Sequence, residues 1–222
     1  MHTEAFEKLG QKYKNKRPDS ELDLIMDVSD ILSEYCPPND SSYSPHRITM
    51  QTFQSLQNGV SEIEYPEDFD ERVKGAMDKT ISTVNKLNEL NVDEIVQQLE
   101  EIHADLGEID YDTEAYHTMS MVGVSVAIES TKLWHAAVFD SSHDLHEAVT
   151  GGHRQLQEDD GVASLSDIVL TDIASAMNGG LVEVSKNSSL FFMPADLIRK
   201  TLLASIAGSA SAALSYVQEL NL

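Results

Sequence analysis

Hydrophobic residues recur at helical spacing between the prolines of segment 18–38. Its apolar stripe consists of Leu24, Val28, Ile31, Leu32 and Tyr35. Positions three and four residues apart lie on one face of an α-helix. Proline is tolerated in the first turn of a helix but breaks its interior. The segment therefore predicts a helix that begins after Pro18 and ends before Pro37.

Segments 68–90 and 91–106 show the same spacing. The first stripe contains Val73, Met77, Ile81, Val84 and Leu87, and the second contains Ile95, Leu99 and Ile102. Asn91 lies between the two segments, and an asparagine side chain there can accept a hydrogen bond from the first turn of a helix. We expect two consecutive helices, the second capped by Asn91.

The segment 113–139 is apolar on all sides rather than on one face. From Ala115 to Ile128 it contains no Asp, Glu, Lys or Arg. This run is shorter than the roughly 20 residues that span a bilayer. Its β-branched residues would suit a strand, but its length favours a helix buried at the centre of a bundle, with Trp134 packed in the core.

A last apolar segment, near 195–219, is uncharged from Thr201 to Gln218. Its larger apolar stripe contains Leu203, Ile206, Ala210, Ala213 and Val217, and its small-residue face contains Ala204, Gly208 and Ala212. Small residues at every fourth position allow two helices to approach closely. We expect close packing inside the bundle, with a protein partner or self-association through this C-terminal helix as the alternative.

The region 150–194 is less regular. The stretches "TGGH", "EDDG", "NGG" and "KNSS" are typical of turns, and they flank a short predicted helix near 165–177.

Taken together, the patterns predict an all-α fold: residues 1–222 form a single acidic domain, a helical bundle of about six to eight helices. Its two marked elements are the buried central helix near 113–139 and the small-residue C-terminal helix near 195–219.

The charge balance limits the partners. Against 38 acidic residues the chain has 15 basic ones, a formal net charge of −23. Such a charge repels nucleic acid and anionic lipid and suits cations, basic partners or high solubility. A basic cluster from Lys8 to Arg17 is either a solvated face or a docking patch for an acidic surface, including the protein's own. We expect no signal peptide and no transmembrane segment, hence a soluble chain whose compartment stays open.

Two stretches resemble a known family. The first carries Ser125, Val126, Ala127, Ser130 and Trp134; the second carries Asp172, Ile173, Ala174, Ala176, Gly179 and Gly180. They are similar to the Ser-Val-Ala-x-x-Ser-x-x-x-Trp helix and the downstream Asp- and Ala-containing, glycine-ended stretch of a family of uncharacterised small helical proteins, found mostly in Bacteroidetes. The resemblance covers about the central half of the chain. The resemblance implies an all-α fold. It implies no activity, because the family has none assigned.

Two Glu-x-x-His pairs suggest a metal site. Glu100 with His103 and Glu114 with His117 lie on consecutive predicted helices. Carboxylate-bridged di-metal sites take such a pair from each of two helices, plus a glutamate from each of two others. Antiparallel packing would bring His103 beside His117. The competing interpretation assigns Glu114 and the preceding aspartates to a helix N-terminus, where negative charge is stabilised.

A second candidate cluster lies in the sequence "HDLHE". His143 and His146 are three residues apart, Glu147 is adjacent, and His153 follows a Gly-Gly turn. Two or three imidazoles with one carboxylate match the ligand set of zinc or non-haem iron. Histidines on a polar helix face are the competing interpretation.

Other catalytic patterns are missing from the sequence. It contains no Gly-x-Ser-x-Gly, no phosphate-binding loop and no Gly-x-Gly-x-x-Gly. We therefore expect no cofactor, and a non-catalytic acidic helical protein that acts through binding or assembly. The alternative is a metal-binding protein or metalloenzyme that uses one of the His/Glu clusters, so the sequence leaves open whether the protein is an enzyme.

Overall fold

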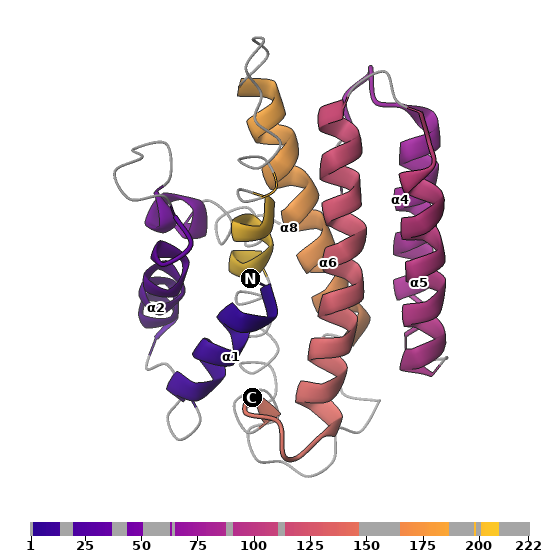
Figure 1. The fold of residues 1–222 in the computed structure, drawn as a ribbon. Helices are drawn as coiled ribbons and strands as arrows, with labels where there is room; N and C mark the ends of the chain where they lie inside the picture. The colour runs from indigo at the N-terminus through magenta and orange to yellow at the C-terminus, as the bar shows by residue number, and fades with distance from the viewer. Residues whose placement is uncertain are drawn as a thin grey trace.

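The protein is an all-α helical bundle (Figure 1). The computed structural model describes residues 2–13, 20–36, 44–50, 63, 65–87, 91–110, 114–146, 165–186, 198 and 201–208. Its labelled helices are α1 (His2–Tyr13), α2 (Glu21–Ser33), α4 (Glu71–Val84), α5 (Val92–Gly107), α6 (Glu114–Phe139) and α8 (Leu165–Lys186). Residues 45–50 and 201–208 are also helical, and no described residue lies in a strand. The fold class predicted from the sequence is confirmed.

Three helices begin at side chains that cap them. Ser20 caps α2, Asp70 caps α4 and Asn91 caps α5, each by accepting a hydrogen bond from a backbone N–H group two or three residues further on. A cap of this kind satisfies one of the four backbone donors that a helix leaves unpaired at its start. The prediction for Asn91 is confirmed, and α2 and α4 begin within the segments predicted for them.

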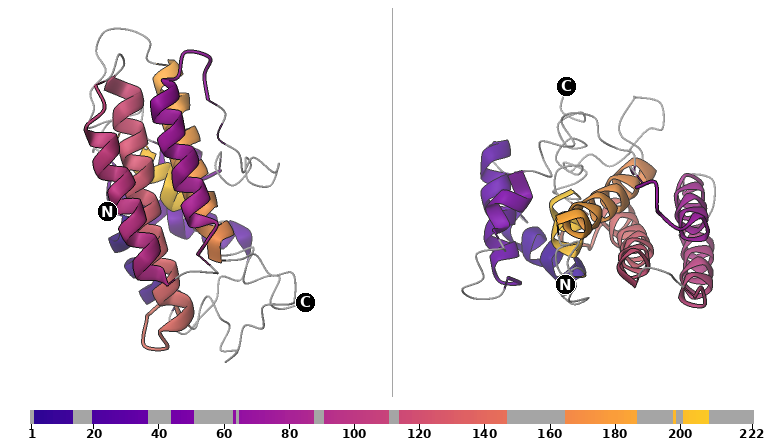
Figure 2. Two further views of the ribbon diagram at one scale, coloured as in Figure 1. Left: turned by 90° about the vertical axis from the view of Figure 1, so that its right-hand side faces the viewer. Right: turned by 90° about the horizontal axis from the view of Figure 1, so that it is seen from above.

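Helix α6 is the central element of the bundle. It packs against α1, α4, α5 and α8. Figures 1 and 2 show α4, α5, α6 and α8 side by side, with α1 on the other side of α6 and α2 further out, against α1. Contact with four other helices explains why α6 is apolar all round, and the predicted central helix is confirmed. Neither α6 nor any other described helix is long and apolar enough to cross a membrane.

Helix α8 is longer than the sequence predicts. The "NGG" stretch, predicted as a turn, lies inside the helix at residues 178–180. A Cβ atom at Gly179 would lie 2.5 Å from the Cβ of Ala204, and one at Gly180 would lie 2.5 Å from Met119. The two glycines thus let α8 approach the 201–208 helix and α6. The turn prediction is wrong because these glycines serve packing rather than chain reversal.

The 201–208 helix packs inside the bundle. Leu203 and Ile206 are buried, and a Cβ atom at Gly208 would overlap the Ser175 side chain of α8. Together with the contact between Ala204 and α8, this confirms close packing for the described part of the small-residue face. Residues 209–219 of the predicted C-terminal helix lie outside the described residues.

Two described lysines of the basic cluster pair with acidic residues of the protein itself, whereas Lys14, Lys16 and Arg17 lie outside the described residues. Lys8 pairs with Glu34 at 2.6 Å, and Lys12 pairs with Asp27 at 2.5 Å. These ion pairs join α1 to α2, and exposed pairs of this kind contribute about 0–1 kcal/mol each. The main attachment of α1 is apolar, since the ring of Phe6 packs edge-on against Trp134 with centroids 5.3 Å apart.

Candidate functional site

The turn after α6 carries the predicted cluster that begins with His143. Nδ1 of His143 accepts a hydrogen bond of 3.2 Å from a backbone N–H, so a neutral His143 carries its proton on Nε2. Nδ1 of His146 lies 3.0 Å from a backbone carbonyl oxygen, which can only accept, so His146 donates from Nδ1. His146 is therefore in a form that suits a metal ligand, whereas His143 is not.

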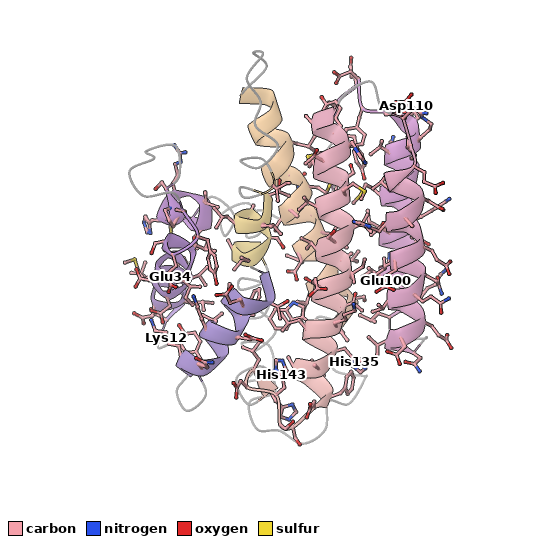
Figure 3. All side chains as sticks on the ribbon, in the orientation of Figure 1. Lys12, Glu34, Glu100, Asp110, His135 and His143 are labelled. Carbon is pink, nitrogen blue, oxygen red and sulfur yellow. The ribbon has the colours of Figure 1, made fainter. Side chains whose placement is uncertain are left out.

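The remaining members of that cluster, Glu147 and His153, lie outside the described residues. Figure 3 shows His143 at the end of the bundle that carries His135, while Glu100 lies further along α5. Within the described ranges, no group of three or more His, Cys, Asp or Glu side chains is arranged to hold a metal ion.

The two Glu-x-x-His pairs do not meet in the described structure. Glu100 is exposed and lies 3.5 Å from Lys132, and His103 contacts Ser125 rather than His117. Ser125 lies eight positions beyond His117 on α6, about 12 Å by the helical rise. Because α5 and α6 run antiparallel, the start of α6, which carries His117, lies beside the C-terminal end of α5. His117 is therefore further along the bundle than His103. The side chain of Glu114 lies outside the described residues.

The contact between Ser125 and His103 has the composition of a nucleophile and its base. Nε2 of His103 lies 3.0 Å from Oγ of Ser125, and the same hydroxyl donates to the carbonyl oxygen of Met121 at 2.9 Å. A serine hydroxyl has one hydrogen to donate. When that hydrogen is directed to Met121, the ring nitrogen of His103 is the donor to Ser125. The pair ties α5 to α6.

Three residues of the family resemblance meet in the core. Oγ of Ser130 and Nε1 of Trp134, both on α6, donate to the same carboxylate oxygen of Asp172 on α8, at 2.5 and 3.0 Å. All three side chains are at most 1% exposed. A buried carboxylate is costly unless it is hydrogen-bonded, so this cluster fixes the register of α6 against α8. It is closed to solvent and has the geometry of a structural anchor.

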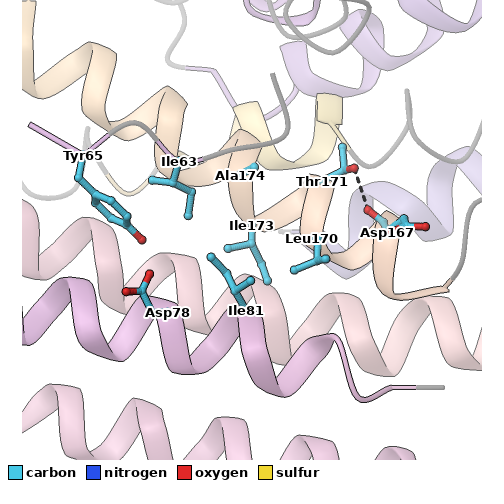
Figure 4. Close-up of a pocket in the computed structure, with 9 residues that line it drawn as sticks. All are labelled: Ile63, Tyr65, Asp78, Ile81, Asp167, Leu170, Thr171, Ile173 and Ala174. Carbon is cyan, nitrogen blue, oxygen red and sulfur yellow. Dashed lines mark hydrogen bonds between the residues drawn. The ribbon is translucent and has the colours of Figure 1, made fainter. Parts of the chain in front are cut away.

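A pocket opens between α4, α8 and the segment that contains Ile63 and Tyr65 (Figure 4). Its volume is about 560 Å³, within the range typical of small-molecule sites. The described lining residues are Ile63, Tyr65, Asp78, Ile81, Asp167, Leu170, Thr171, Ile173 and Ala174. Five of these nine side chains are apolar, so the walls suit an apolar ligand body.

The polar lining groups lie at two opposite ends of the pocket. Figure 4 shows the Tyr65 hydroxyl and the Asp78 carboxylate at one end, and Asp167 with Thr171 at the other. The apolar side chains lie between them. Among the described lining residues two are acidic and none is basic, while the ammonium of Lys74 lies 5.7 Å from the ring centroid of Tyr65, outside the lining.

Tyr65 occupies an unusual environment for a phenol. Its hydroxyl oxygen is buried and has no hydrogen-bond partner among the described residues. Burial raises the pKa of Tyr65 above its ordinary value of 10.0, and the negative charge of Asp78 raises it further. The ring packs on Phe69, with centroids 4.9 Å apart, and lies under the ammonium of Lys74. At neutral pH the phenol of Tyr65, which is one of the lining residues of the pocket, is therefore neutral.

No protein-family model, curated protein or solved structure matches this chain.

Sequence reasoning did not find the pocket. Ile81 belongs to the apolar stripe of α4, and Asp78 precedes it by one turn, so neither position stands out. The buried cluster of Ser130, Trp134 and Asp172 has a clearer signal in the sequence. Asp172 is the single charged residue between Val169 and Leu181, and a carboxylate in such an apolar stretch indicates a buried polar partner.

Proposed function

We propose that this protein is a non-catalytic binding protein that takes a small amphipathic cation into the pocket between α4 and α8. The observation that carries the proposal is the combination of an apolar pocket of about 560 Å³ with the Tyr65 hydroxyl and the Asp78 carboxylate at one end. The ligand would place its ammonium group there and its apolar body against Ile81 and Ile173.

The balance of forces assigns different roles to the two parts of such a ligand. Asp78 is exposed, and an exposed ion pair contributes only about 0–1 kcal/mol. Each buried methylene group contributes about 0.8 kcal/mol. A chain of several methylenes would therefore supply most of the affinity, while Asp78 and the net charge of −23 would select a cation over an anion.

The chemistry of the pocket supports binding rather than catalysis. A general base must be poised to take a proton near neutral pH, and a phenol whose pKa is raised by burial, as in Tyr65, does not ionise there. No histidine, serine or cysteine is among the described lining residues, and the two carboxylates, Asp78 and Asp167, lie at opposite ends of the pocket and not as a pair. The hydroxyl of Tyr65 is suited instead to exchange a hydrogen bond with the polar end of a ligand.

A calorimetric titration of the full chain tests the proposal with octylamine, octanol and octanoate, which share an apolar chain and differ in charge. We expect octylamine to bind most tightly and octanoate most weakly. Asp78→Asn should weaken octylamine binding about fivefold, the value of one exposed ion pair. Glu71→Gln is the matched control, because it removes the same charge from α4 at an exposed position outside the pocket.

Two results would contradict the proposal. One is octanoate binding as tightly as octylamine, since that would show no preference for a cation. The other is an equal loss of affinity in Asp78→Asn and Glu71→Gln, since the effect would then come from the net charge of the molecule and not from the pocket.

A further inference from the structure

A second acidic residue, Asp167, lines the pocket at the end remote from Tyr65, and Figure 4 shows its carboxylate on the outer side of that end. Asp167 lies in the first turn of α8 and Ala174 lies two turns further on, and both line the pocket. The α8 wall between them is about 10 Å long by the helical rise. Figure 4 shows Asp78 beyond one end of this wall and Asp167 at the other.

The Thr171 hydroxyl strengthens the second end. Its Oγ1 donates to the backbone carbonyl oxygen of Asp167 at 2.8 Å (Figure 4). A hydroxyl whose hydrogen is used in this way presents its oxygen as an acceptor. The end of the pocket near Asp167 therefore offers a hydroxyl oxygen as well as a carboxylate, which suits a ligand group with several hydrogens to donate.

We propose that the pocket takes a long, flexible dication: an alkyl α,ω-diamine or polyamine with one ammonium near Asp78 and Tyr65 and the other near Asp167 and Thr171. This assignment rests on the proposed function and narrows its ligand class. Three arranged features carry it: acceptors at both ends, apolar side chains between the ends, and no basic side chain among the described lining residues.

The alternative ligand for the second end is an anion. Asp167 lies near the N-terminus of α8, where the backbone N–H groups carry partial positive charge and attract negative groups. The Asp167 carboxylate itself supplies negative charge at this helix end. A ligand with a carboxylate at each end would therefore meet a negative charge at both ends of the pocket.

The test compares octylamine with the diamine and the dicarboxylate of the same chain length, by calorimetric titration of the full chain at fixed ionic strength. We expect the diamine to bind about fivefold more tightly than octylamine and the dicarboxylate to bind more weakly than either. Asp167→Asn should remove most of the advantage of the diamine and leave octylamine binding nearly unchanged. Glu71→Gln, which makes the same change in net charge, should preserve that advantage.

Each outcome bears on the assignment. Equal binding of octylamine and the diamine to the native chain would overturn the dication while leaving the proposed function in place. Absence of binding by both amines would overturn the two proposals together. Tight binding of the dicarboxylate, or an equal effect of Asp167→Asn and Glu71→Gln on the diamine, would also overturn the two-ended site.

Discussion

The indole nitrogen of Trp134 donates a hydrogen bond of 3.0 Å to the carboxylate of Asp172, deep between α6 and α8. Trp134 is 1% exposed and Asp172 is fully buried. The bond joins the central helix to the helix that forms one wall of the pocket. Because the ring of Trp134 also packs on Phe6 of α1, a single side chain connects three helices.

Replacing Trp134 should therefore destabilise the whole bundle. Trp134→Ala removes the largest fully buried side chain of the described structure, and truncations of buried aromatic residues cost about 3–5 kcal/mol. We expect a loss of this size in the free energy of unfolding, measured by chemical denaturation followed by circular dichroism. A loss below about 1 kcal/mol would show that Trp134 does not pack in the core.

Trp134→Phe separates packing from hydrogen bonding. Phenylalanine keeps an aromatic ring against Phe6 but cannot donate to Asp172, so a buried acceptor loses one partner. A loss of this kind costs about 1–3 kcal/mol. The variant should therefore lie between the native chain and Trp134→Ala in its stability.

The helices could be predicted from the sequence where their determinants are local. The stripes of α2, α4 and α5 follow from the helical period, and the start of α5 follows from the chemistry of Asn91. The position of α6 at the centre follows from its uncharged length. These predictions depend on residues only a few positions apart, which is why they hold in the structure.

The pocket and the extent of α8 could not be predicted in this way. The "NGG" turn prediction fails because the partners of Gly179 and Gly180 include Met119 and Ala204, on other helices. The pocket likewise depends on Asp78 and the α8 wall coming together across a long stretch of chain. Such juxtapositions are set by helix packing and leave no local pattern.

The family resemblance stays a prediction. Three of its residues, Ser130, Trp134 and Asp172, form one hydrogen-bonded cluster between α6 and α8. In this chain Ser130 and Trp134 on one helix and Asp172 on another are the parts of a buried anchor. The cluster carries no chemistry that would assign a reaction.

The glycine at the end of the 201–208 helix supports a prediction about packing. At Gly208 an added Cβ atom would overlap Ser175, whereas at Gly75, in α4, nothing lies within 4 Å. Gly208→Ala and, more strongly, Gly208→Leu should lower stability, by about 1–3 kcal/mol for such overpacking. Gly75→Ala should raise it by about 0.5–1 kcal/mol, because alanine is the better helix former.

Light scattering on the same variants tests self-association through the C-terminal helix. Internal packing of Gly208 against α8 predicts a change in melting temperature without a change in molecular mass. A conversion from dimers to monomers in Gly208→Leu would show that this face meets a second chain instead. Ser215, the natural comparison further along the predicted helix, lies outside the described residues.

The metal hypothesis gives a specific expectation for His143. In the described geometry Nδ1 of His143 accepts a backbone hydrogen bond, so this imidazole is not in a ligand form. We expect His143→Ala to leave zinc affinity within about twofold of the native value, as for His46→Ala at an exposed position. A tenfold loss in His143→Ala alone, measured on a chain without a histidine tag, would contradict this and support a zinc site in the turn after α6.

Alkaline pH should unfold the protein through its buried tyrosines. Burial raises the pKa of Tyr35, Tyr65 and Tyr116 above the ordinary value of 10.0. Below pH 10 these phenols are neutral in the folded and in the unfolded chain, so their stabilising contribution is fully present. Above pH 10 the tyrosines of the unfolded chain ionise first, because their pKa is lower than in the folded chain. The free energy of unfolding therefore falls as the pH rises. Tyr65→Phe removes one such group and should move the alkaline unfolding midpoint, followed by circular dichroism, to higher pH. Phenolate absorbance that appears for all tyrosines near pH 10 without loss of helix would contradict this linkage.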